Sequence, residues 1–160
     1  MKNNNQLKKY TRDLIDNSFP ELKNKRILIS YGQLGPFWGI SWWVLPFLKI
    51  IVISPKAKNI SPEALAGLLA HELSHQVIYQ RESWLKYIVR TPLIYTVFKK
   101  MVKNEERQVD RMVMDRGFGY QLYILTKIID QDSSHDCVKN YYFSPEEIEA
   151  YCLNNNKRFK

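Results

Sequence analysis

The sequence has few cysteines, and their arrangement excludes two kinds of protein. Cys137 and Cys152 are the only two among 160 residues. They are too few for a secreted domain held by several disulfides, and they lack the paired spacing of a zinc-binding cysteine framework. The N-terminal stretch MKNNNQLKKYTRDL is too polar for a secretory signal peptide. These features predict a reducing, cytoplasmic setting.

The sequence also lacks an unbroken apolar run of the roughly 20 residues that a membrane-spanning helix needs. Residues 37–53 contain a glycine, a proline and a lysine, and are interpreted as strands. Residues 84–102 are interrupted by four basic residues and a proline. We interpret this connector as two helices packed on the domain. The alternative is association with an anionic membrane surface, because its tryptophan and tyrosines lie beside basic residues.

The composition predicts one folded domain spanning residues 1–160. A hydrophobic content of 45% and an aromatic content of 13% argue against disorder, and the length suits a single core. We therefore expect all motifs to belong to one site. The net charge of +8 favours anionic partners. A membrane surface is the candidate that fits best, and nucleic acid is not expected.

The order of the expected elements predicts an α+β fold. Periodicity and turn residues predict strands at 26–31, 40–45 and 48–54, and helices at 5–17, 62–80, 105–116, 119–130 and 146–154. The sheet should have three strands or slightly more. Ser61-Pro62-Glu63 is a strong helix start, with a hydroxyl cap, a proline in the first turn and a carboxylate near the positive end of the dipole. Asn104 is expected to cap the helix that follows it.

The stretch AHELSHQV at 70–77 contains the pattern His-Glu-x-x-His. Residues four apart share one face of a helix, so His71 and His75 can direct their rings at one zinc ion. Glu72 is then angled away from direct ligation, where it can take a proton from a water. Random placement of 3 histidines and 9 glutamates would give this pattern roughly 0.003 times in such a chain. The alternative is a helix that merely contains two imidazoles.

Catalytic zinc normally takes three protein ligands and keeps one position for water, so a third ligand is required. Glu106 and Asp110 are four apart on a predicted helix, and both can face the first motif. Glu106 would complete the protein ligands, and Asp110 would accept a hydrogen bond from a ligand imidazole. Glu105 competes for the ligand role, but the residue four positions later is Val109, which can orient nothing. His135 is a further, isolated candidate.

The two motifs together resemble those of the gluzincin clan of zinc metallopeptidases. The short chain, with a sheet ahead of the motif, is most similar to the archaeal minigluzincins and to the catalytic core of membrane-anchored gluzincins. The resemblance covers about residues 48–117 and is specific only at HELSH and Glu-xxx-Asp. In these relatives the second motif has alanine before the aspartate and small residues after it. Here Val109 takes the place of the alanine, and larger residues follow Asp110.

The resemblance implies a small zincin-like domain, with a sheet packed on the motif helix and on a second ligand-bearing helix. It implies that His71, His75 and Glu106 are the zinc ligands, that Glu72 is the general base, and that Asp110 orients a ligand. The implied activity is a zinc-dependent endopeptidase acting on peptides or unfolded proteins. Two alternatives are a basic module that binds membranes or nucleic acid, and an inactive relative that binds peptide without cutting it.

The resemblance implies three further features. A strand within 48–54 would bind extended substrate through its backbone at the sheet edge. A histidine, tyrosine or arginine would stabilise the oxyanion. The candidates for that role are Arg107, Arg111, His135, Tyr141 and Tyr142. Some minigluzincins are latent because a C-terminal segment occupies the cleft, so residues 131–160 are expected either to inhibit, as in a zymogen, or to complete the core.

Overall fold

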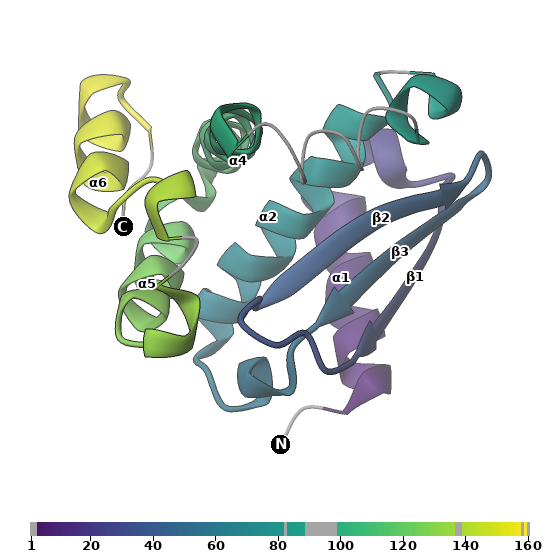
Figure 1. Ribbon diagram of the computed structural model, residues 1–160, viewed down its shortest axis with the longest axis horizontal. Coiled ribbons are helices and arrows are strands. Elements are labelled where there is room, and N and C mark those ends of the chain that lie inside the picture. The colour runs from purple at the N-terminus through teal and green to yellow at the C-terminus, as the bar shows by residue number, and fades with distance from the viewer. Residues whose placement is uncertain (1–2, 82, 89–98, 137–138, 158, 160) are drawn as a thin grey trace.

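The computed structural model describes residues 3–81, 83–88, 99–136, 139–157 and 159 (Figure 1). A three-stranded sheet packs against helices, as predicted from the sequence. The helices are α1 (Asn4–Ser18), α2 (Pro62–Tyr79), α4 (Lys99–Val113), α5 (Gly119–Asp130) and α6 (Pro145–Asn154). Helix α2 lies between the sheet and α5, and α6 packs against α5 on the far side. The α+β prediction is confirmed.

The sheet consists of β1 (Arg26–Tyr31), β2 (Gly39–Leu45) and β3 (Leu48–Ile53), in the order β1-β3-β2. Strand β3 pairs in parallel with β1 and antiparallel with β2. The prediction that a strand within 48–54 presents a free edge to substrate is therefore wrong. The backbone of β3 is used in ladders on both sides, and β2 is the edge strand nearest to α2.

Helix α2 begins as predicted and is buried along its length. Ser61 caps it by accepting a hydrogen bond from the Ala64 backbone N–H (3.1 Å), and Pro62 occupies the first turn. Every residue from Ala64 to Tyr79 is buried. The motif residues thus stand on a rigid element enclosed by the sheet on one side and helices on the other.

The prediction that Asn104 caps the second ligand-bearing helix is wrong, because Lys99 is already helical. The buried face of α4 starts before Asn104 and continues past it. Its buried members are Val102, Glu106, Val109, Asp110 and Val113. Asn104 lies on the exposed side of this helix, within the helix and not at its start. A π-helical turn at Met114–Phe118, with Gly117 at a φ of 84°, then leads into α5.

The connector at 84–102 lies partly outside the described residues. That it forms two helices therefore remains a prediction. Residues 84–88 are helical, and this short helix contacts the sheet. The Trp43 backbone N–H donates to the Tyr87 hydroxyl (3.2 Å), and the two rings are 5.9 Å apart. Among the described helices, none is both long and apolar enough to cross a membrane.

The C-terminal part of the chain contributes side chains to the main core. Phe143, Ile148 and Cys152 are buried in the same cluster as the residues of α2 and α5. Ser144 caps α6 through a capping box with Glu147. Removal of residues 131–160 would therefore expose the core.

Candidate metal centre

Two motif histidines and one glutamate from the second helix meet at a single buried point. His71 and His75 project from α2, and Glu106 projects from α4. The Nε2 atoms of His71 and His75 are 3.2 Å apart, and each lies 3.2 Å from Glu106 Oε2. One ligand atom from each residue lies within 4.8 Å of the others, which defines a group that can hold a metal ion.

The outer nitrogen of each imidazole has its own partner. His71 Nδ1 lies 2.9 Å from Asp110 Oδ1, and a carboxylate only accepts hydrogen bonds, so Nδ1 carries the proton there. His75 Nδ1 lies 3.0 Å from the Tyr79 hydroxyl. When the Tyr79 hydroxyl accepts from His75 Nδ1, both Nε2 atoms present a lone pair to the centre. This arrangement orients the imidazoles as ligands need to be oriented.

The electrostatics of the cluster attract positive charge. Burial opposes charge on His71, but hydrogen bonds to Asp110 and Glu106 outweigh it and raise its pKa well above the ordinary value. Burial likewise opposes charge on His75, and the Glu106 carboxylate raises its pKa overall. Burial tends to raise the pKa of Glu106, yet both histidines hold it far below the ordinary range. Two imidazoles and a carboxylate are a donor set that suits zinc, which would replace these protons.

Glu72 lies beside the cluster with its carboxylate buried and incompletely paired. The residue is 3% exposed, and its Oε2 atom has no hydrogen-bond partner among the described residues. Burial raises its pKa, against the opposing effect of His71 and His75. A buried, unpaired carboxylate oxygen at this place is suited to bind a water or another donor held at the metal. The residues present thus fit a bound zinc ion.

The start of β2 leaves room for this carboxylate. A Cβ atom added at Gly39 would overlap with the Glu72 carboxylate, so a side chain there would displace the carboxylate. Ser41, two residues later, donates to the Glu72 backbone carbonyl (2.8 Å). The edge strand therefore sets the position of Glu72. Neither Gly39 nor Ser41 belongs to a motif that could be recognised in the sequence.

Asp110 connects the cluster to the C-terminal segment. Its Oδ1 faces His71, and its Oδ2 accepts a hydrogen bond from the Phe143 backbone N–H (3.0 Å). The carboxylate is 1% exposed. Because both oxygens are used, an amide at this position could not accept both hydrogen bonds, since its nitrogen only donates. The C-terminal segment thereby helps to hold the imidazole of His71 in place.

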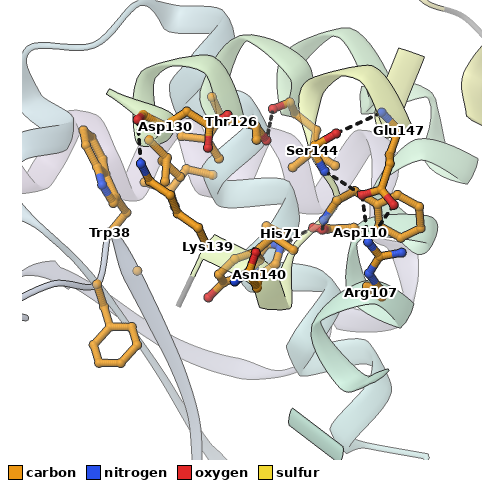
Figure 2. A pocket seen from close by; sticks show the side chains of 18 of the residues that line it. Trp38, His71, Arg107, Asp110, Thr126, Asp130, Lys139, Asn140, Ser144 and Glu147 are labelled. Atoms are coloured by element: carbon orange, nitrogen blue, oxygen red, sulfur yellow. Dashed lines mark hydrogen bonds and ion pairs between the residues drawn. The ribbon is translucent and has the colours of Figure 1, made fainter. Parts of the chain in front are cut away.

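Two cavities of about 330 Å³ and 340 Å³ flank the cluster. Both are lined by Phe37, Gly39, His71, Glu72 and Tyr142. The ring of Tyr142 lies 5.7 Å from the ring of His71, between the two cavities. Figure 2 shows the first cavity, with Trp38 on one side, the paired Arg107 and Glu147 on the other, and His71 and Asp110 between them.

The remaining sequence candidates occupy different places. Glu105 Oε1 lies 3.9 Å from the outer nitrogen of His75, whereas Glu106 Oε2 lies 3.2 Å from its Nε2, so the structure favours Glu106 at the centre. Arg107 donates from one guanidinium nitrogen to both carboxylate oxygens of Glu147 (2.7 Å), and Arg111 lies over the Phe143 ring. Tyr141 is half-buried at the end of a short 3-10 helix. The side chain of His135 lies outside the described set.

Comparison of the chain with known protein families, curated proteins and solved structures gave no match. The evidence for the fold and for the buried cluster of His71, His75 and Glu106 therefore comes from the structure alone.

Proposed function

We propose that this protein is a zinc metallopeptidase of the gluzincin type, which cleaves peptide bonds within extended or unfolded polypeptides. The observation that carries the proposal is the convergence of His71, His75 and Glu106 beside Glu72, whose carboxylate is buried and incompletely paired. Three protein ligands of this kind are typical of catalytic zinc, which keeps a position for water. Structural zinc sites usually have four protein ligands and are rich in cysteine.

The chemistry follows from the placement of the side chains. When bound, zinc would lower the pKa of a coordinated water to about 7 and polarise the scissile carbonyl. Glu72 would accept the proton of the attacking water and deliver it to the nitrogen of the leaving amine. Burial raises the pKa of Glu72, which favours the first of these transfers, the acceptance of the proton from water. Asp110 would hold the His71 ring in the tautomer that keeps its Nε2 lone pair on the ligand side.

The edge strand β2 offers a backbone surface for the substrate. The Ser54 N–H donates to the Trp38 carbonyl, while the Trp43 N–H points the other way, to Tyr87. By alternation, the backbones of Gly39 and Ser41 also point away from β3. These residues line the second cavity, beside the cluster. An extended peptide could add there as a further strand, which would select unfolded segments.

Tyr142 is the basis for proposing that the protein is latent. Its ring contacts the ligand His71 and lines both cavities, where a substrate would have to lie. A role in completing the core is compatible with this, because the next residue, Phe143, is buried. Truncation of the C-terminal segment would remove both the ring that lies in the cleft and the side chains that complete the core. A point substitution separates them.

Activity on an unstructured protein such as casein is expected to rise about tenfold in Tyr142→Ala, because the aromatic ring no longer competes with substrate. Tyr142→Phe should stay at the parental rate, and Tyr141→Ala is the matched control. Chelation should abolish the activity of Tyr142→Ala, and zinc should restore it. A fall in both Tyr142→Ala and Tyr142→Phe would instead identify the hydroxyl as the oxyanion stabiliser. Chelator-resistant hydrolysis would contradict the metallopeptidase proposal.

A further inference from the structure

The sheet has a second apolar face, opposite the helices. Along β3 the side chains of Lys49, Ile51 and Ile53 are buried, whereas Leu48, Ile50 and Val52 alternate with them on the other side. Helices α1 and α2 pack on the buried side, against β1 and β2 respectively. In Figure 1 the strands pass in front of α1, which leaves the outer face toward the viewer.

The outer face presents a continuous row of large apolar side chains. By strand register, Ile50 lies between Leu28 on β1 and Trp42 on β2. Leu28 is 46% exposed and Trp42 is 43% exposed. Phe47, in the turn between β2 and β3, is 67% exposed. Contiguous exposed apolar surface of this kind marks an interaction site more often than it marks chance exposure.

The same part of the chain carries positive charge only. Residues 22–62 contain no aspartate or glutamate, and they contain six basic residues. The basic residues are Lys23, Lys25, Arg26, Lys49, Lys56 and Lys58. Lys49 is buried toward the helices, and Lys56 pairs with Asp132 at 2.7 Å. Arg26 lies on the outer face with Leu28, two residues later on β1, and Lys25 adjoins it.

Two groups of basic side chains lie next to the row of exposed apolar side chains. Arg26 pairs in register with Leu48, so Arg26 and Lys25 lie at the same end of the sheet as the turn that carries Phe47. A groove of about 300 Å³ at the edge formed by β1 and α1 is lined by basic and apolar side chains together. Its basic residues are Lys8, Arg12 and Lys25, and its apolar residues include Leu28. Apolar and cationic groups are thus interleaved on one side of the molecule.

We propose that this outer face docks on the surface of an anionic lipid bilayer. The apolar row would enter the boundary between headgroups and acyl chains, and the flanking bases would contact lipid phosphates and carboxylates. A second copy of the chain fits less well, because residues 22–62, which include the three strands, contain basic but no acidic residues, so two apposed sheets would repel each other. Strand β2 belongs both to this face and to the wall of the second cavity, so docking brings the cleft to headgroup level. The proposal goes beyond the proposed peptidase function and does not depend on it.

The test is co-sedimentation with vesicles of phosphatidylcholine containing phosphatidylserine, with vesicles of phosphatidylcholine alone for comparison. The parent is expected to bind the anionic vesicles, and less so at high salt. Leu28→Thr combined with Phe47→Ser should weaken binding about tenfold or more, because less apolar surface is buried. Leu153→Ser, which removes a 62% exposed leucine on α6, is the matched control and should bind like the parent.

A second variant tests the charge without changing the apolar row. Lys8→Gln combined with Lys25→Gln replaces two exposed bases and should also weaken binding to anionic vesicles. Circular dichroism and sedimentation velocity establish that each variant is folded and what its oligomeric state is. If the parent protein does not co-sediment with anionic vesicles, the proposal is wrong. It is also wrong if Leu28→Thr and Phe47→Ser convert a parental dimer to a monomer, because the face would then be an interface between copies.

Discussion

Replacement of Glu106 by alanine is expected to remove zinc from the protein, whereas replacement of the adjacent Glu105 should leave zinc in place. Glu106 Oε2 lies 3.2 Å from Nε2 of both His71 and His75. Glu105 Oε1 lies 3.9 Å from the outer nitrogen of His75. Loss of the carboxylate would leave two ligands, and zinc affinity should fall by at least about 100-fold, more than the loss of an outer hydrogen bond costs.

Competition with a chromophoric chelator, at equal protein concentration, measures this affinity for the parent, Glu106→Ala and Glu105→Ala. Both variants remove one carboxylate from α4 at neighbouring positions, so they are closely matched. Circular dichroism checks that α4 remains folded. Equal zinc affinity in the parent and in Glu106→Ala would show that the metal, if bound, lies elsewhere. Loss of zinc in Glu105→Ala alone would transfer the ligand role to Glu105.

Glu72→Gln is expected to keep zinc bound while hydrolysis nearly disappears. Glutamine has the same size as glutamate, so it fits beside Gly39, but its amide cannot take the proton from the attacking water. Loss of a general base typically costs a factor of about 10² to 10⁴ in rate. The measurement is the rate of casein cleavage at equal zinc occupancy, made in the Tyr142→Ala background so that latency does not hide the effect.

Glu149→Gln is the control for this variant, because it removes a carboxylate from an exposed position on α6. It should cleave at the rate of its parent. If Glu72→Gln cleaves as fast as the control, Glu72 is not the base. If neither cleaves while both bind zinc and peptide, the chain is an inactive relative that recognises peptide.

The cluster could be predicted from the sequence because its spacing is local. His71 and His75 are four apart on a helix whose start is marked by Ser61 and Pro62, so their shared face follows from helix geometry. The spacing favours Glu106 over Glu105 because Asp110 lies four residues after Glu106, and the structure places that aspartate against His71. The same reasoning could have found Tyr79, which is four residues after His75 and lies 3.0 Å from its Nδ1.

The contacts that position Glu72 could not be predicted, because they depend on packing between distant segments. Ser41 reaches the Glu72 carbonyl across 31 residues, and Gly39 meets its carboxylate only because β2 lies against α2. Periodicity gave the three strands but not their order. A hairpin between β2 and β3 is a local feature, whereas the choice of β1 to pair with β3 rather than with β2 is not. The interpretation of β3 as an edge strand failed for that reason.

The cap assigned to Asn104 failed for a different reason. A capping residue is recognised by its type, but asparagine is also tolerated at an exposed position inside a helix. The buried Val102, four residues ahead of Glu106, already belongs to the same face of α4. The apolar pattern was the stronger signal there, and it continues through Asn104 without interruption.

Anomalous diffraction at the zinc edge, from crystals grown with one equivalent of zinc, is the most direct measurement of the central claim. The account predicts a single strong peak about 2.0 to 2.2 Å from Nε2 of His71, from Nε2 of His75 and from a carboxylate oxygen of Glu106. It also predicts a water in the remaining position, within hydrogen-bonding distance of Glu72. A peak at another place, or no peak between the two helices, would contradict it.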